Sequence, residues 1–173
     1  MNKIRIQHYH CPVGELLLGE FNDQLCLCDW RYRKMRSTID RRLTMQLKAE
    51  YMESDSELLQ LTRQQLVEYF NGHRSTFDLP LLMAGSEFQK QVWLALLNIP
   101  YGQTTSYLSL AQTINNPLAV RAVASANGAN AMSIFIPCHR VIGSNGQLVG
   151  YAGGISAKEK LLHLENNLFS AKD

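Results

Sequence analysis

The 173-residue sequence lacks any apolar run of the length that crosses a membrane, which is roughly 20 residues. The residues that follow Met1, from Asn2 to Arg5, also lack the apolar stretch of a signal peptide. These two absences argue against membrane insertion and against secretion. We therefore expect a globular protein that resides in the cytoplasm and has no membrane partner.

Cysteine is scarce and unevenly placed, because three of the four cysteines fall early in the chain and Cys138 lies alone in the second half. A reducing compartment would keep all four as thiols. No pair has the Cys-x-x-Cys spacing of a zinc site, so we expect neither a metal nor a cofactor. The alternative is a structural zinc in the N-terminal part, and its candidate ligands are His8, His10, Cys11, Cys26 and Cys28.

The sequence also has no strong excess of charge of either sign. Its formal net charge is +2, from 17 Lys and Arg against 15 Asp and Glu. Residues 1–85 carry 11 charges of each sign, and the remainder carries 6 basic against 4 acidic residues. Proteins that bind nucleic acids through phosphates usually show a dense basic face. Charge alone therefore does not identify this protein as a nucleic-acid binder.

The N-terminal third of the sequence is typical of a small sheet followed by a helix. Short apolar runs near 4–6, 15–18 and 25–28 are separated by turn residues, which predicts an antiparallel meander of three strands. Apolar residues then recur at helical spacing over 58–70. The following Asn71-Gly72 predicts the end of that helix.

The sequence also indicates a division of the chain into two domains. The charged stretch from Arg31 to Arg42 predicts no element, and residues 77–82 predict a short extended segment. A linker over 83–85 follows that segment. We therefore expect one domain over residues 1–84 and a second over residues 85–173.

The second part of the sequence predicts three helices. The capping box Ser86-Glu87-Phe88-Gln89 predicts a helix that ends before Ile99-Pro100-Tyr101-Gly102. A second helix is predicted over 105–114. A third is predicted over 117–126, with Asn116 as its cap and a proline at its first position. Two short helices joined by a tight turn form a helix-turn-helix.

The third of these helices is nearly free of bulk and charge, since Arg121 sits among alanines. Taken alone, this pattern favours a close contact between helices. The alternative is a DNA contact, because helix-turn-helix units place their second helix in a groove. Its small face and the dipole at its N-terminus could then approach phosphate or base. Base-reading side chains are scarce there, so little sequence preference is expected.

The candidate chemistry lies in an apolar, strand-like stretch over 133–142 that contains Pro-Cys-His-Arg. A thiol becomes a strong nucleophile only as a thiolate, and His139 could take the proton of Cys138 directly or through one water. Glu165, at the end of a helix predicted over 156–164, could orient the imidazole. The alternatives are a structural cysteine beside an unrelated histidine and a solvated carboxylate.

Two further segments could contribute to a site. The glycine-rich stretch over 149–154, which follows a hairpin-like turn at 144–147, lets a backbone loop pass close to a ligand, or it is an irregular connection. Asn127 and Asn130 precede the cysteine segment. Asparagine commonly closes turns, and turn formation is the favoured interpretation of both.

Taken together, these motifs resemble the O6-alkylguanine-DNA alkyltransferases, also called methylated-DNA-protein-cysteine methyltransferases. The resemblance extends from Ser86 to Glu165, with the motifs in the order and spacing of that family. The N-terminal part is similar only loosely. The matching segments are Phe88-Gln89, Val92-Trp93, Ile99 to Gly102, Arg121 to Val123, Asn127 to Asn130, Ile136 to Ile142, Gly150 to Gly154, Lys158-Glu159 and Leu161-Leu162.

The resemblance implies both a fold and an activity. The fold is α+β, with an N-terminal ribonuclease-H-like α/β part followed by a mostly helical, winged helix-turn-helix-like domain. The activity is DNA repair by direct, stoichiometric and irreversible transfer of an alkyl group, such as methyl, from O6-alkylguanine to Cys138. O4-alkylthymine is an open second substrate. The implied protein is a monomer that flips the damaged base out of double-stranded DNA, uses no cofactor and reacts once.

The resemblance also assigns catalytic roles to individual residues. Cys138 is similar to the alkyl acceptor, His139 to a base that works through water, and Glu165 to the carboxylate that orients this base. Asn130 is similar to an asparagine that steadies the turn beside the cysteine. Tyr107 is similar to a tyrosine that contacts the 3′ phosphate and donates toward the base.

Further residues would contact DNA and the flipped base. Arg121 resembles the arginine that fills the gap left by the base. The other DNA contacts implied near it are Ala119, Ala122, Ser125 and Ala126. The residues implied to surround the base are Asn127, Val141, Tyr151, Ala152 and Gly153.

The sequence departs from the family at two positions near the site. Ala131 stands where many members have proline, and Ala152 where some have serine, so the stiffness of the loop and the donors near O6 differ.

Three other functions compete with alkyl transfer. They are a lesion-binding relative without repair activity, which the presence of Cys138 argues against, a cysteine hydrolase, and a DNA-binding regulator.

Overall fold

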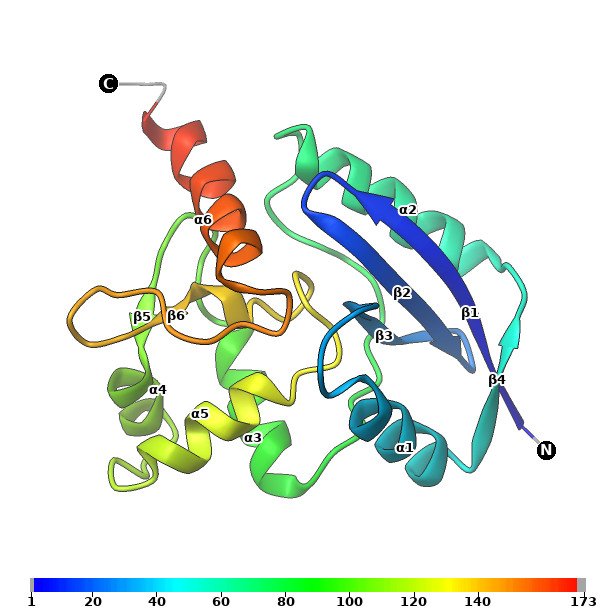
Figure 1. Cartoon of the computed structure of the whole chain (residues 1–173), viewed down its shortest axis with the longest axis horizontal. Coiled ribbons are helices and arrows are strands. Elements are labelled where there is room, and N and C mark those ends of the chain that lie inside the picture. The colour runs from blue at the N-terminus through cyan, green and yellow to red at the C-terminus, as the bar shows by residue number, and fades with distance from the viewer. Residues whose placement is uncertain (1, 171–173) are drawn as a thin grey trace. The chain divides into compact units, whose positions relative to one another are not determined.

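The computed structural model describes residues 2–170, with side chains as far as Asn166 in the last helix (Figure 1). The chain divides into two compact units, Met1–Gly85 and Ser86–Asp173. The first combines a sheet with helices and the second is mostly helical, so the predicted α+β class is confirmed. No helix in the described part of the chain is long and apolar enough to span a bilayer.

The first unit is built on a four-stranded sheet with the strand order β3-β2-β1-β4. β1 (Asn2–Cys11), β2 (Gly14–Phe21) and β3 (Gln24–Trp30) form the predicted antiparallel meander, and each is longer than the apolar run that predicted it. β1 buries Ile4 and Ile6 on alternate positions, whereas β2 and β3 are buried along most of their length. The core of this unit therefore centres on β2 and β3.

α2 (Glu57–Phe70) packs across β1, β2 and β3, which confirms the helix predicted in this region. The hydroxyl oxygen of Ser56 caps it by accepting a hydrogen bond from the backbone N–H of Leu59 at 3.1 Å. Beyond this helix, Leu81 forms a parallel bridge with Leu25 of β3. The predicted extended segment thus pairs with the sheet at a single position.

Two elements of the first unit have no counterpart in the prediction. α1 (Arg36–Leu47) forms within and beyond the charged stretch, and β4 (Ala49–Glu53) follows it and pairs parallel to β1. α1 buries only Ile39 and Leu43, so it lacks the apolar stripe by which a sequence pattern is detected. Lys48, in the left-handed conformation at φ 50°, ends the helix and starts the turn into β4.

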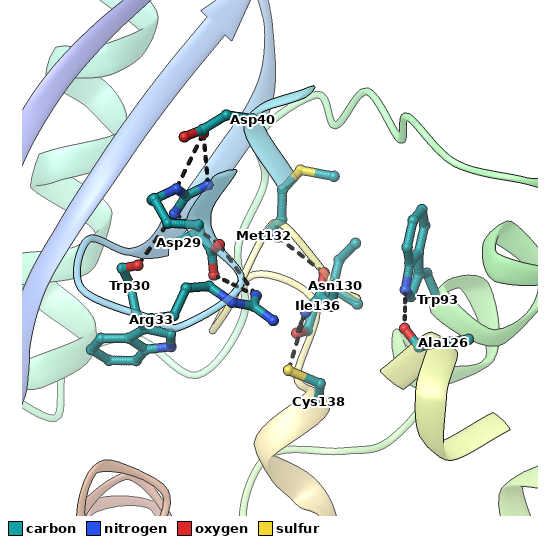
Figure 2. Close-up of polar contacts among 11 residues, drawn as sticks. Asp29, Trp30, Arg33, Asp40, Trp93, Ala126, Asn130, Met132, Ile136 and Cys138 are labelled. Carbon is teal, nitrogen blue, oxygen red and sulfur yellow. Dashed lines mark hydrogen bonds and ion pairs between the residues drawn. The ribbon is translucent and has the colours of Figure 1, made fainter. Parts of the chain in front are cut away.

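Ion pairs to a buried carboxylate hold α1 against the sheet, although this helix buries few apolar side chains. Asp29 is fully buried at the end of β3, and its two carboxylate oxygens accept hydrogen bonds from Arg33 and Arg36 at 3.2 and 2.9 Å (Figure 2). Arg36 also pairs with Asp40 at 3.1 Å. Charged residues that look like a solvated stretch in the sequence thereby anchor the first turn of α1 to the sheet.

The second unit begins with three helices that pack on one another. α3 (Glu87–Leu96) has both halves of the predicted capping box, with Ser86 and Gln89 each bonding to the backbone N–H of the other. α4 (Tyr107–Thr113) and α5 (Val120–Gly128) form the helix-turn-helix. Apolar side chains at the centre of these helices are buried: Val92, Trp93, Leu96, Leu110, Ala111 and Val123.

The predicted start of the third helix is wrong. α5 begins at Val120, and Ala119 occupies the N-cap position without a side-chain hydrogen bond. Asn116 instead helps to close α4, because its backbone N–H bonds to the carbonyl of Ala111 at 2.9 Å while Asn115 is left-handed at φ 59°. The asparagine pair thus ends one helix, and the residues up to Ala119 form a separate turn.

The predicted strand-like approach to Pro-Cys-His-Arg is also wrong. Residues 131–141 are all buried, but they follow an irregular path in which Ser133 bridges to Ile136. Cys138–Arg140 forms a short 3₁₀ turn, η1, and only Val141–Ile142 forms a strand, β6. Apolar composition indicates burial here but does not specify an extended backbone.

Two further elements complete the second unit. β6 pairs parallel with β5 (Thr105–Ser106), and a turn follows in which the backbone N–H of Gly143 bonds to the carbonyl of Gln147 at 2.8 Å. This confirms the predicted turn. α6 (Ile155–Ser170) is longer than predicted, so Glu165 lies inside the helix and not at its end.

Candidate active site

Cys138 is buried in η1, with 3% of its surface exposed. Its sulfur accepts a hydrogen bond from Nδ2 of Asn130 at 3.2 Å. The same amide nitrogen donates to the carbonyl of Ile136 at 2.9 Å, and Oδ1 accepts from the backbone N–H of Met132 at 3.0 Å (Figure 2). Asn130 therefore closes the local turn and also presents a donor to the sulfur, which favours the thiolate.

His139 and Glu165 form a buried pair beside Cys138. Nε2 of His139 lies 2.7 Å from Oε2 of Glu165, and both side chains are almost completely buried. Burial lowers the pKa of His139, and the charges of Arg140 and Lys158 act in the same direction, whereas Glu165 opposes the shift. The imidazole is therefore neutral at pH 7, with its proton on Nε2 facing the carboxylate.

The second ring nitrogen of His139 is available for proton transfer. Nδ1 is buried and has no hydrogen-bond partner among the residues whose side chains the structure describes. Because Nε2 carries the proton, Nδ1 carries the lone pair. The ring can therefore accept a proton at Nδ1 while it keeps its bond to Glu165.

Arg140 is a member of the site that the sequence interpretation did not assign. Its Nε and Nη2 donate to the two carboxylate oxygens of Glu165 at 2.9 and 3.1 Å, and Nη1 donates to the carbonyl of Ile99 at 2.6 Å. Burial alone would raise the pKa of Glu165, but His139 and Arg140 outweigh it and lower this pKa to about 2. The solvated carboxylate considered as an alternative is thereby excluded.

Lys158 is a second member that sequence interpretation did not assign. It is fully buried on α6, and its Nζ donates to the carbonyls of Val141, Val149 and Gly150 at 2.6, 3.0 and 3.2 Å. Burial lowers the pKa of Lys158, and the charge of Cys138 opposes this shift. The ammonium group ties the glycine-rich loop to β6. Periodicity does not distinguish Lys158 from an ordinary basic residue of a helix.

Tyr107 reaches the same loop from the start of α4. Its hydroxyl donates to the carbonyl of Val149 at 3.2 Å, so this carbonyl accepts from both Tyr107 and Lys158. Burial raises the pKa of Tyr107, as does the nearby Cys138, and Asn127 opposes the shift. The phenol is therefore protonated at neutral pH and acts as a donor. Asn127 also donates to the carbonyl of Cys138 at 3.4 Å.

The residues expected to surround the base differ in how deeply they are buried. Val141 is buried directly after η1, and the ring of Tyr151 lies edge-on to that of His139 with centroids 6.5 Å apart. Ala152 and Gly153 are half-buried on the loop that follows Tyr151. These positions lie on the segments tied together by the buried lysine.

The residues expected to contact DNA separate into two faces of α5. Arg121, Ala122 and Ser125 are exposed, and Ala119 is half-buried at the N-cap. Ala126, by contrast, is only 3% exposed, and its carbonyl accepts a hydrogen bond from Nε1 of Trp93 at 2.9 Å (Figure 2). Its place on the helix turns it toward α3 and away from solvent.

The three N-terminal cysteines lie in strands β1 and β3 of the sheet. Cys11, Cys26 and Cys28 are buried, and burial raises the pKa of each thiol, that of Cys26 to about 12. Within the residues that the structure describes, no group of three or more His, Cys, Asp or Glu is arranged to hold a metal ion.

Fold and site together define a protein with a buried cysteine, beside a histidine–carboxylate pair, in a helix-turn-helix domain. Models of two domains of one family match the chain. The ribonuclease-like domain of 6-O-methylguanine DNA methyltransferase matches residues 4–83, and its DNA binding domain matches residues 87–167.

Individual relatives agree with this family. The constitutive methylated-DNA–protein-cysteine methyltransferase of Bacillus subtilis is 42% identical over 93% of this chain and 94% of its own length. The enzyme of the same name from Methanosarcina barkeri is 43% identical over 90% and 93%. The crystal structure of Mycobacterium tuberculosis OGT in complex with DNA superimposes with a TM-score of 0.80 at 36% identity, over 95% of this chain and 93% of that one. The chain belongs to the methylated-DNA–protein-cysteine methyltransferase family.

Proposed function

We propose that this protein repairs double-stranded DNA by moving the alkyl group of O6-alkylguanine onto Sγ of Cys138, once per chain. The observation that carries the proposal is the buried His139–Glu165 pair directly beside a buried cysteine, in a chain that belongs to a family of alkyl acceptors. The protein would act as a monomer. It would act in the reducing cytoplasm, where the acceptor persists as a thiol.

The proton of the thiol leaves first. Nδ1 of His139 takes it through one bridging water, and Nε2–H keeps its bond to Glu165. The resulting imidazolium lies beside the carboxylate, and the thiolate keeps the hydrogen bond from Asn130. Arg140 already balances the charge of Glu165, so the transfer separates charge inside the site without changing its total.

The thiolate then attacks the alkyl carbon. A carbon–sulfur bond forms, the bond between this carbon and O6 breaks, and the electron pair leaves with the guanine. The leaving base needs one proton, and the phenol of Tyr107 is a protonated donor at neutral pH. The thioether offers no route for water to regenerate the thiol, so each chain reacts once.

The target base must leave the duplex to reach a buried sulfur. Flipping costs roughly a few kcal/mol of stacking and pairing, and the exposed Arg121 on α5 would fill the gap in the duplex. Lys158 would hold the loop that carries Tyr151 and Ala152 over the base. O6-alkylguanine is the proposed substrate, and the roles of these residues are part of the same proposal.

Intact-mass spectrometry after incubation with a duplex that contains one O6-methylguanine tests the proposal. The wild type should gain one methyl group, and a Cys138→Ser variant should gain none. A Cys28→Ser variant is a matched control, because that thiol is buried in the sheet, and it should react like the wild type. Tight binding without any gain in mass would indicate a lesion sensor, and turnover on an ester would indicate a hydrolase.

A further inference from the structure

Asn127 is a buried polar residue whose side-chain amide makes few hydrogen bonds within the described part of the chain. It lies near the end of α5 with 5% of its surface exposed. Its Nδ2 donates to the carbonyl of Cys138, eleven positions along the chain, at a long distance of 3.4 Å. This long-range bond differs from the local turn that the sequence favours for this asparagine.

The oxygen of this amide is the more unusual atom. Oδ1 of Asn127 is buried and has no hydrogen-bond partner among the residues whose side chains are described. An amide offers two N–H donors and an oxygen with two lone pairs, and buried groups of this kind are nearly always paired. Asn130 follows this rule, because both its Oδ1 and its Nδ2 make hydrogen bonds. The oxygen of Asn127 therefore calls for a donor that comes from a ligand.

The donors that the site itself holds are already engaged. Lys158 directs its ammonium group at three carbonyls, and each side-chain nitrogen of Arg140 already donates a hydrogen bond. The hydroxyl of Tyr107 donates to the carbonyl of Val149. To turn toward Asn127, any of these groups would have to give up a bond that holds the site together.

The Asn127 amide also reaches two groups that the proposed function brings to the base. One is the Cys138 segment, through its carbonyl. The other is the hydroxyl of Tyr107: burial raises the pKa of Tyr107, and hydrogen bonding by the Asn127 side chain opposes this rise. A base that contacts both Cys138 and Tyr107 would therefore come within reach of Oδ1.

We propose that Asn127 selects guanine by accepting, at Oδ1, a hydrogen bond from the 2-amino group of the flipped base. This inference rests on the proposed function, because it assumes that O6-alkylguanine is the substrate. Alkylation at O6 leaves N1 without a proton, so the 2-amino group carries the only N–H donors of the damaged base. A site built around such a bond rejects an analogue that lacks the donor, because its buried acceptor then stays unpaired.

Substitutions in both the protein and the base isolate this contact. The wild type and Asn127→Leu are each given a duplex with one O6-methylguanine or one O6-methylhypoxanthine, which lacks only the 2-amino group. Leucine keeps the branched shape of asparagine and has no polar atom. Single-turnover assays give a second-order rate constant for each pair, and the ratio between the two bases measures the preference for guanine. Effects of the amino group on base pairing are common to both proteins and cancel in this comparison.

The wild type should prefer O6-methylguanine, and this preference should be roughly three- to tenfold weaker in Asn127→Leu, which is the range of one ordinary hydrogen bond. Asn127→Asp keeps an acceptor at this position and should retain the wild-type preference. Ser133→Ala is the matched control, because Oγ of Ser133 is also buried without a partner among the described residues, and it should retain the preference as well. A purely structural loss would lower both rates and leave the ratio unchanged.

Three results would overturn the inference: an unchanged preference in Asn127→Leu, a lost preference in Asn127→Asp, or an equal weakening in Ser133→Ala. Methyl transfer from O6-methylguanine to the wild type is measured in the same series. If transfer occurs and the Asn127→Leu preference is unchanged, the role of Asn127 is wrong and the proposed function stands. If the wild type gains no methyl group, the proposed function itself fails.

Discussion

Replacing Glu165 by glutamine should destabilise the second unit strongly, although the side chain keeps its size. The carboxylate accepts hydrogen bonds from both His139 and Arg140, whereas an amide presents one oxygen and an unwanted donor. The change leaves the guanidinium of Arg140 buried without its counter-charge. Breaking a buried pair in this way typically costs about 3–5 kcal/mol.

The pKa of Glu165 gives a second estimate of the same magnitude. It falls from an ordinary value of 4.5 to about 2, and each unit corresponds to about 1.4 kcal/mol, which gives about 3 kcal/mol at neutral pH. Because the folded pKa is depressed, this contribution is fully present above pH 4.5. It is lost as the pH falls through 4.5 toward 2, and the Glu165→Gln variant should lack this loss.

Urea unfolding followed by tryptophan fluorescence is the assay. The protein has two tryptophans, so a Trp30→Phe background leaves Trp93, which lies in α3, as the reporter of the second unit. Glu159→Gln is the control on the same helix, because that side chain is exposed, and it should change the stability by less than about 0.5 kcal/mol. The reasoning is refuted if Glu165→Gln unfolds within that same margin of the wild type.

Three other substitutions or conditions should affect the reaction. Asn130→Ala removes the donor to the sulfur of Cys138 and two hydrogen bonds to the backbone. Single-turnover transfer assays should show a rate at least tenfold lower. Denaturant unfolding should show a free energy of unfolding that is lower by about 1–3 kcal/mol. Lys158→Met leaves three carbonyls without their ammonium donor, and limited proteolysis should cut the 143–154 loop faster, whereas Lys160→Met should not alter cleavage. Because burial lowers the pKa of His139, transfer should be independent of pH from 8 to 7 and fall only as the pH drops below 6.5; a decline already between pH 8 and 7 would contradict the assignment of this base.

Local signals in the sequence were sufficient for several elements. The capping box at Ser86 and the turn residues between the first strands act over a few residues, and their hydrogen bonds form wherever the surrounding chain permits. Elements that depend on distant partners were missed. α1 requires Asp29 at the end of β3 to receive its arginines, and no periodicity within residues 31–42 encodes that contact.

The candidate site likewise contains residues that local sequence signals indicate and residues whose role depends on distant partners. Cys138 and His139 are adjacent and stand out in an apolar segment. Glu165 is a candidate to orient the imidazole, but periodicity alone favours a solvated carboxylate. Arg140 and Lys158 looked like ordinary basic residues. Their importance follows from burial against a carboxylate and against three carbonyls, which only the folded chain reveals.

The most direct test of the account is to locate and count the transferred group. The protein is incubated with an excess of duplex that contains O6-methylguanine, and peptide mass mapping then follows methylation at every cysteine with time. The account predicts that methylation reaches one group per chain, stops there, and is confined to Cys138. Methylation of another cysteine, or continued consumption of the lesion after the plateau, would contradict it.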